Sequence, residues 1–300
     1  MSAQAAPSVT GDDTTTTVVR PVAVVGAGTM GNGIAQVFAM SGRRVLLIEP
    51  NEPALKKGLA TIEKSLGKLS EKNVITAQAS HDALHRIATC EEDGLKLSNC
   101  AIAVEAVPEK IEIKRAVHEM LDQKLPPDAI LATNTSSISV TELAAITKRP
   151  TRFIGMHFMN PVPVMQLVEV VRGLETSPET VAETVALAKA LGKTPVVVED
   201  RPGFVSNRVL LPMINEAAFA LMEGVADKEA IDTVMKLGMN HPLGPLALAD
   251  LIGVDVCLDI LEVLHRGLGE DKYRPCPLLR TMVAAGRLGR KTGRGFYEYR

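Results

Sequence analysis

The stretch Val22-Ala-Val-Val-Gly26-Ala-Gly28-Thr-Met-Gly31 decides the fold of this chain. Its apolar, mostly β-branched start predicts a buried strand, and the glycines that follow have the spacing of a Gly-x-Gly-x-x-Gly turn. A helical pattern then runs to Gly42, and residues 44–49 form a second apolar run. Strand, turn, helix and strand together predict a βαβ unit.

The glycine spacing in this unit is typical of a nucleotide-binding turn. Gly26 permits the tight turn, Gly28 lets the backbone approach a pyrophosphate, and Gly31 lets the helix pack on the strand. The helix N-terminus offers free N–H groups and a positive dipole end to the phosphates. Glu49 ends the next strand, where its carboxylate can accept from adenosine ribose hydroxyls. The two residues after it supply no cation for a 2′-phosphate, so the pattern favours NAD over NADP.

Strand-like runs and helical patterns continue to alternate after this unit. The further strands are expected at residues 102–105, 130–133, 153–157, 166–171 and 195–198. Helices are expected at residues 52–69, 109–123 and 178–191. The alternation predicts an α/β, Rossmann-type doubly wound, mostly parallel sheet over residues 19–200, with ligands beyond the carboxyl ends of the strands. We expect residues 1–18 to form a disordered tail.

From Val205 onward the pattern is helical. The expected helices are residues 205–223, 228–237, 246–265 and 278–286. Residues 210–222 are apolar nearly all round, which suggests deep burial or a subunit interface, and Pro212 is expected to kink or restart that helix. The domain boundary is therefore expected at residues 200–203, followed by an all-α domain over residues 201–300 for substrate binding and dimerisation.

The composition argues against several classes of protein. The chain has 300 residues, of which 46% are hydrophobic and 23% charged, as expected of a two-domain globular protein. Its net charge of -2 argues against a nucleic-acid or acidic-membrane partner. No uninterrupted apolar run approaches the roughly 18 residues of a membrane span. The first twenty residues resemble neither a secretion signal nor a mitochondrial presequence, so we expect a cytoplasmic location.

Cysteines and histidines give no metal-binding pattern. The cysteines have no zinc spacing, and we expect reduced structural thiols at Cys90, Cys100, Cys257 and Cys276. His81 and His85 could share a helix face, but no acidic or cysteine partner stands nearby at a useful spacing. Solvated histidines are therefore favoured, and no metal is expected.

One histidine and one glutamate lie in apolar surroundings within GMHFMNPVPVMQLVEV, residues 155–170. The prolines at 161 and 163 fit a turn between two strands, and such a return can bring His157 and Glu169 together. A carboxylate on one imidazole nitrogen fixes the tautomer and leaves the other nitrogen free to accept a proton. A structural pair is an equal alternative until the nucleotide fold is considered. Oxidation of an alcohol with NAD needs a base, which favours catalysis.

The order and spacing of several motifs resemble one family over residues 20–300, the short-chain (S)-3-hydroxyacyl-CoA dehydrogenases, and within it the bacterial 3-hydroxybutyryl-CoA dehydrogenases. The motifs are GAGTMGNGIAQVFA, VEAVPE, TNTSSIS, GMHFMNPVPVMQLVEVV, DRPGFVSNRVL and GRKTGRGFY. The resemblance implies NAD as cofactor, an acyl-CoA substrate, a role in fatty-acid or related metabolism, and a homodimer. Glu49 departs from the family, which usually has Asp there.

The resemblance also implies roles for individual residues. It implies His157 as catalytic base, Glu169 as its partner, Ser136 as a donor to the reacting oxygen of the substrate, and Asn207 as the fourth member of the catalytic set. Family positions that contact NAD match Gly26, Ala27, Gly28, Thr29, Met30, Gly31, Glu49, Glu109, Lys114, Ser136, Asn160 and Lys291. Those that contact coenzyme A match Ser65, Lys72 and Ser136.

The resulting expectation is an enzyme that reversibly oxidises an (S)-3-hydroxyacyl-CoA, of short chain, to the 3-oxoacyl-CoA. Two alternatives stay open. A relative of the same fold could act on a free hydroxy acid or sugar acid, and it would be indifferent to the CoA handle. A non-catalytic NAD-binding protein would bind NADH without turnover.

Overall fold

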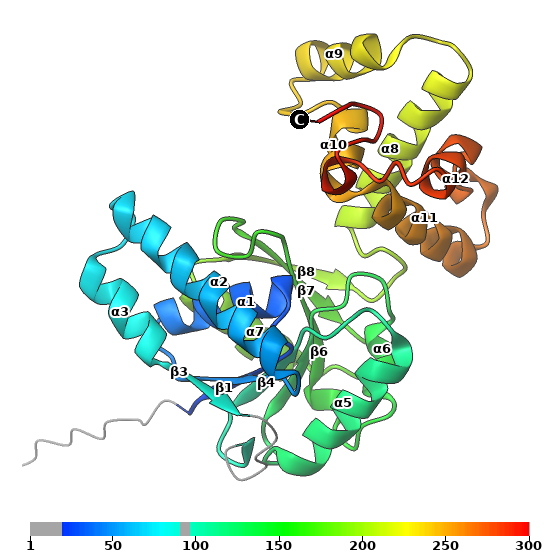
Figure 1. The fold of residues 1–300 in the computed structure, drawn as a ribbon. Coiled ribbons are helices and arrows are strands. Elements are labelled where there is room, and N and C mark those ends of the chain that lie inside the picture. Colours follow the sequence, from blue (N-terminus) through cyan, green and yellow to red (C-terminus); the bar gives the residue numbers. More distant parts are fainter. Residues whose placement is uncertain (1–19, 91–96, 300) are drawn as a thin grey trace, which may run out of the picture.

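The structure, a computed structural model, describes residues 20–90 and 97–299 (Figure 1). The tail expected at residues 1–18 lies outside these residues. In the described part, eight strands form one sheet in the order β3-β2-β1-β4-β5-β6-β7-β8. They are β1 (Val22–Val25), β2 (Val45–Ile48), β3 (Ile87–Cys90), β4 (Ile102–Glu105), β5 (Ile130–Thr133), β6 (Phe153–Phe158), β7 (Leu167–Arg172) and β8 (Thr194–Glu199).

The strand order creates one crevice at the carboxyl edge of the sheet. β1 pairs in parallel with both β2 and β4, so the connections leave in opposite directions on either side of it. Such a reversal is where doubly wound sheets bind their ligands. Only the pairing of β6 with β7 is antiparallel among the described strands, which confirms the predicted return strand and the mostly parallel sheet.

Helices cover both faces of the sheet. In the six central strands, residues of one strand belong to two different cores. Val24 of β1, for example, faces one core and Val25 the other. The first face packs against α1 (Thr29–Met40), α2 (Glu52–Glu71), α3 (Ala77–His85) and α7 (Pro178–Ala190). The second packs against α5 (Ile111–Lys124) and α6 (Val140–Ala144). Strands that are buried on both sides explain the continuous apolar runs in the sequence.

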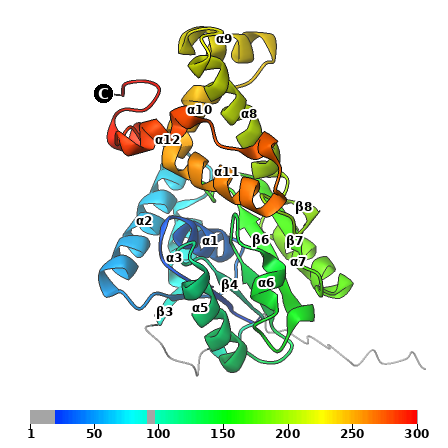
Figure 2. The same cartoon turned by 90° about the vertical axis from the view of Figure 1, so that its right-hand side faces the viewer.

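A helical part follows the sheet and has its own core. Its helices are α8 (Ser206–Met222), α9 (Lys228–Gly238), α10 (Pro245–Ile252), α11 (Val254–Leu268) and α12 (Pro277–Ala284). Figures 1 and 2 place this part beyond one end of the sheet part. The boundary expected at residues 200–203 falls between β8 and α8 and stays a prediction. Among the described residues, no helix is long and apolar enough to cross a membrane.

Two details of the helical prediction are wrong. The helix expected at residues 246–265 is two helices, because Gly253 adopts a φ of 111° that a helix cannot contain. α8 runs through Pro212, so the expected restart there is wrong, and the expected kink stays a prediction. A proline there removes one backbone hydrogen bond, and burial of Leu211 and Ile214 on either side holds the helix together.

The sequence prediction also missed two helices, α3 and α6, and one strand, β3. α6 has only five residues, too few to show a helical period. β3 is a short strand at the edge of the sheet, and α3 has Ala83 as its buried side chain, so neither has a strong apolar period. On α3, His81 and His85 stack with their ring centroids 4.0 Å apart, and both are exposed. The described residues contain no group of three or more His, Cys, Asp or Glu side chains that could hold a metal ion.

Candidate active site

The glycine turn between β1 and α1 is sterically obligatory. Gly26 has a φ of 100°, and a Cβ on Gly31 would lie 1.8 Å from the Gly26 carbonyl oxygen. Gly28 is the N-cap residue of α1 and makes no side-chain cap, so the first N–H groups of the helix have no side-chain acceptor there. The turn therefore has the close backbone approach and the free donors that a dinucleotide pyrophosphate requires.

Glu49 lies beside this turn, directly after β2. Its Oε2 accepts a hydrogen bond from the Ala27 N–H and its Oε1 accepts one from the Asn51 N–H, both at 3.1 Å. The carboxylate is thus held at the end of the strand next to the glycine turn, where a dinucleotide ribose is expected. The residues present fit NAD at this edge.

A pocket of about 480 Å³ lies between the sheet part and the helical part. Its polar side chains come from the loop after β4, from the ends of β5 and β6 and from the start of α8. Its apolar wall includes Leu210, Ile252, Val256 and Ile260 of the helical part. The polar residues among its lining are Glu109, Asn134, Ser136, His157, Asn160, Ser206 and Asn207. The fold therefore brings together all the residues expected to form the catalytic set except Glu169, which lies directly behind His157.

His157 and Glu169 face each other across the antiparallel strands β6 and β7. The His157 Nδ1 lies 2.8 Å from Glu169 Oε2, and the two side chains are 10% and 2% exposed. Ser206 donates to the same Oε2 from its hydroxyl, and the N–H groups of Val205 and Ser206 donate to Oε1. Burial opposes the charge of Glu169, but the His157 and Ser206 hydrogen bonds outweigh it and lower the pKa of this carboxyl. Glu169 is therefore an anion that requires a donor at His157 Nδ1.

Ser136 and Asn207 both line the pocket, and a hydrogen bond connects them. The Asn207 side-chain amide donates to the Ser136 carbonyl oxygen at 3.2 Å. Asn207 is in the first turn of α8, whereas Ser136 follows β5, so this bond joins the helical part to the sheet part. Asn134 also lines the pocket, and its Oδ1 accepts from the Phe158 N–H at 2.9 Å.

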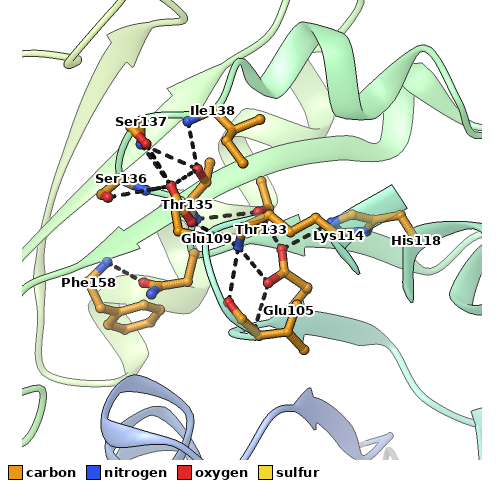
Figure 3. A network of polar contacts seen from close by, with 12 residues as sticks. Glu105, Glu109, Lys114, His118, Thr133, Thr135, Ser136, Ser137, Ile138 and Phe158 are labelled. Atoms are coloured by element: carbon orange, nitrogen blue, oxygen red, sulfur yellow. Dashed lines mark hydrogen bonds and ion pairs between the residues drawn. The ribbon is translucent and has the colours of Figure 1, made fainter. Parts of the chain in front are cut away.

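Glu109 adjoins Ser136, and Lys114 lies next to Glu109, as Figure 3 shows. Glu109 accepts hydrogen bonds from the backbone N–H groups of Ser136 and Ser137, at 2.9 and 3.0 Å. The Lys114 ammonium lies 3.1 Å from Glu109 and 2.7 Å from Glu105, and its side chain is only 1% exposed. In this structure Lys114 thus lies behind Glu109 and does not line the pocket.

A second pocket, of about 470 Å³, lies between α1, α2 and the loop at residues 160–163. Ser65 and Lys57 line it from α2, and Asn160 lines both pockets. Of the expected contacts, Lys72 and Lys291 are not among the described residues that line these pockets. Lys72 is the C-cap of α2, and the Lys291 ammonium pairs with Asp255 at 2.6 Å.

The sequence prediction missed four polar side chains of the site. Three are buried and one is partly buried: Glu105, His118 and Thr133, and Ser206. Glu105 ends β4 and accepts hydrogen bonds from His118 and Thr133. The Ser206 hydroxyl donates to Glu169. Glu105 closes an apolar run that predicts a strand, which is the only signal available for it. A charge placed at the carboxyl end of a central strand is a site candidate in this fold.

Family comparisons agree with this geometry. Residues 21–201 match the model for the NAD binding domain of 3-hydroxyacyl-CoA dehydrogenase, and residues 203–299 match the model for its C-terminal domain. A probable 3-hydroxybutyryl-CoA dehydrogenase of Bacillus subtilis is 55% identical over 284 residues, covering 94% of this chain and 98% of that protein. A 3-hydroxybutyryl-CoA dehydrogenase of Bradyrhizobium diazoefficiens is 53% identical over 283 residues, covering 94% and 96%.

A solved structure agrees as well. The crystal structure of an (S)-3-hydroxybutyryl-CoA dehydrogenase from Ralstonia eutropha superposes with a TM-score of 0.91 at 51% identity, over 94% of this chain and 99% of that one. The matches extend over both parts of the chain, and the domain that they align with the glycine turn is an NAD-binding domain. The chain therefore belongs to the 3-hydroxyacyl-CoA dehydrogenase family, as an NAD-dependent oxidoreductase with a Rossmann-type domain and a helical C-terminal domain.

Proposed function

We propose that this protein reversibly oxidises a short-chain (S)-3-hydroxyacyl-CoA, such as 3-hydroxybutyryl-CoA, to the 3-oxoacyl-CoA. The observation that carries the proposal is the 2.8 Å contact between His157 and Glu169 at the wall of a pocket that Ser136 and Asn207 also line. The names of the relatives support the same reaction.

His157 is the proposed general base. Glu169 is an anion and accepts the Nδ1 proton, so Nε2 is left as the acceptor on the pocket side. In the oxidation, Nε2 takes the proton of the 3-hydroxyl group, and the Glu169 carboxylate stabilises the imidazolium that forms. NAD, when bound, supplies the acceptor for the hydride that leaves carbon 3.

Ser136 and Asn207 are the proposed donors to the reacting oxygen. Both are neutral, so they can stabilise an oxygen as negative charge develops without competing with His157 for the proton. The hydrogen bond from the Asn207 side-chain amide to the Ser136 carbonyl oxygen keeps the two residues in a fixed arrangement. Closure of the pocket by α8 would at the same time exclude water from the reacting groups.

The remaining expected contacts are proposed in two groups. For NAD they are the glycine turn at residues 26–31, Glu49, Glu109, Ser136, Asn160 and Lys291, with Lys114 acting from behind Glu109. For coenzyme A they are Ser65, Lys72 and Ser136. The pocket between α1 and α2 supports the second group, because Ser65 and Lys57 line it. A cationic helix face of this kind favours a polyanionic nucleotide handle.

The CoA handle gives the direct test of the proposed function. We expect kcat/KM for acetoacetyl-CoA reduction to exceed that for free acetoacetate by at least about 10³-fold, since binding of the remote handle contributes to catalysis. NADH should be preferred to NADPH, because no cation follows Glu49. Equal activity on acetoacetate and acetoacetyl-CoA would favour a dehydrogenase of free hydroxy acids. Tight NADH binding without turnover would favour a non-catalytic protein.

We also propose a homodimer formed through the helical part, and a cytoplasmic location. Large apolar side chains are exposed on and around α8 and α9, and they include Val209, Val225, Val234, Leu237 and Met239. An apolar surface of this kind is typical of subunit interfaces. Cys257 and Cys276 are buried and form no disulfide, which agrees with a reducing compartment. Sedimentation at micromolar concentration should give about twice the mass of one chain, and a monomer would contradict the proposal.

A further inference from the structure

A charged cluster lies beneath the pocket, at the end of β4 (Figure 3). Its centre is Glu105, which is 0% exposed. Four donors surround this carboxylate: the Lys114 ammonium at 2.7 Å, the Thr133 hydroxyl at 2.7 Å, the His118 Nε2 at 3.2 Å and the Val107 N–H at 2.8 Å. None of these residues except Val107 lines the pocket, yet β4 and β5 both end at it.

The hydrogen bonds define the charges in this cluster. Among the described residues, His118 Nδ1 has no partner, so the imidazole proton belongs on Nε2, which donates to Glu105. Burial raises the pKa of Glu105, but the His118 and Lys114 interactions outweigh this and hold it at about 2. Glu105 is thus an anion, and the Lys114 ammonium is its charged partner.

Lys114 transmits this interaction toward the pocket. Its ammonium is shared between Glu105 at 2.7 Å and Glu109 at 3.1 Å, and the side chain has almost no exposure to water. An ammonium held by two carboxylates in fixed positions cannot move toward one without losing the other. The position of Glu109 therefore depends on Glu105, although these two glutamates do not touch.

Glu109 in turn holds the loop that carries Ser136. Its Oε1 accepts from the N–H groups of Ser136 and Ser137, from the Ser137 hydroxyl at 3.0 Å and from the Thr135 hydroxyl. The carboxylate thus replaces the missing backbone acceptors of this turn. Among the described side chains, Glu109 is the one that accepts from the Ser136 N–H, at 2.9 Å. The Ser137 N–H has a second, longer contact, with the Thr135 hydroxyl at 3.3 Å. A shift of Glu109 would therefore carry Ser136 with it.

We infer that Glu105 is a positioning residue of the reaction centre, acting through Lys114 and Glu109 on Ser136. The inference rests on the proposed function, in which Ser136 donates to the reacting oxygen. Stability alone gives no reason for such a cluster, since a buried ion pair is often no more stable than packed apolar side chains of similar volume. Catalysis gives a reason for the cluster, because a hydrogen-bond donor that is slightly misplaced loses much of its effect on the reaction rate.

The test compares Glu105→Gln with a matched control on the same helix as Lys114. Asp122 of α5 forms a buried ion pair with Arg149, 2.7 Å long and with side chains 6% and 11% exposed, away from the pocket. Asp122→Asn therefore removes a comparable charge pair outside the site. Each substitution is made alone and together with Ser136→Ala, and kcat/KM for acetoacetyl-CoA is measured with NADH. Circular dichroism and the unfolding midpoint check the fold.

We expect Glu105→Gln to lower kcat/KM by roughly tenfold or more, and Asp122→Asn to change it by less than about twofold. In the Ser136→Ala background the effect of Glu105→Gln should largely disappear, because the donor it positions is already gone. Losses that multiply would overturn the inference while leaving the proposed function intact. An unchanged enzyme with no activity on acetoacetyl-CoA would instead overturn the proposed function.

Two further measurements keep the inference testable. If Glu105→Gln does not fold, Thr133→Val takes its place, since it removes one hydroxyl donor from Glu105 and keeps the ion pairs. Its smaller loss should also disappear with Ser136→Ala, and multiplication would again overturn the inference. If the unchanged enzyme has no turnover, the NADH dissociation constant should still rise in Glu105→Gln and not in Asp122→Asn, because Glu109 lines the same pocket. Equal constants in both would overturn it.

Discussion

A His157→Gln variant is expected to lose about 10² to 10⁴-fold in kcat for acetoacetyl-CoA reduction, which is the usual contribution of a well-placed general acid or base. The glutamine amide can occupy the space of the imidazole, but it cannot exchange a proton at neutral pH. NADH binding should persist, because the glycine turn and Glu49 lie apart from this side chain. The measurements are steady-state kinetics and an NADH titration by fluorescence.

A second histidine supplies the control for this variant. His85 lies exposed on α3, so His85→Gln removes a histidine without reaching the pocket, and its turnover should match that of the unchanged enzyme. The two variants should also unfold at similar temperatures. If His157→Gln kept turnover within about threefold of the unchanged enzyme, His157 would not be the base.

The Glu169→Gln variant is also expected to lose roughly 10² to 10⁴-fold in kcat. The cause lies in the hydrogen bonds that surround the side chain. The Val205 and Ser206 N–H groups require an oxygen at the Oε1 position. The glutamine NH₂ is therefore forced toward His157 Nδ1, which must then accept. That places the imidazole proton on Nε2, so the nitrogen facing the pocket can no longer take a proton from the substrate.

The pH dependence of stability distinguishes this charge from a packing effect. The folded state lowers the pKa of Glu169 below its ordinary 4.5, so its charge stabilises the fold above that pH and less as the pH falls through the folded value. The difference in unfolding free energy between the unchanged enzyme and Glu169→Gln should therefore shrink on acidification below about pH 4.5. Denaturant titrations at several pH values measure it, and a difference that does not vary with pH would indicate lost packing alone.

Whether an element of this fold could be predicted depends on the kind of pattern that its sequence carries. The βαβ unit was predictable because its glycines are required by backbone geometry, as the 1.8 Å approach at Gly31 shows. The pairing of His157 with Glu169 was predictable because a proline-rich turn between two strands implies an antiparallel return. β3 was not predictable, because its residues IATC lack the continuous branched apolar run of equally short central strands such as VAVV and VLLI.

The helical part shows where local patterns fail. Residues 246–265 have the apolar spacing of one helix, and only the backbone conformation of Gly253 divides them. A single glycine inside a helical pattern costs about 1 kcal/mol, which packing can offset or use to end the helix. Pro212 is the opposite case, because neighbouring buried side chains keep α8 continuous through it.

By itself the sequence determined the fold class, the nucleotide edge of the sheet and the residue types of the site. Those properties follow from periods and turns that operate over short distances along the chain. Only the tertiary structure decided that Lys114 lies behind Glu109, that Glu105 is the centre of a buried cluster, and that Ser206 helps to hold Glu169. Hydrogen bonds and charges act through space, so their partners depend on which strand ends the fold brings together.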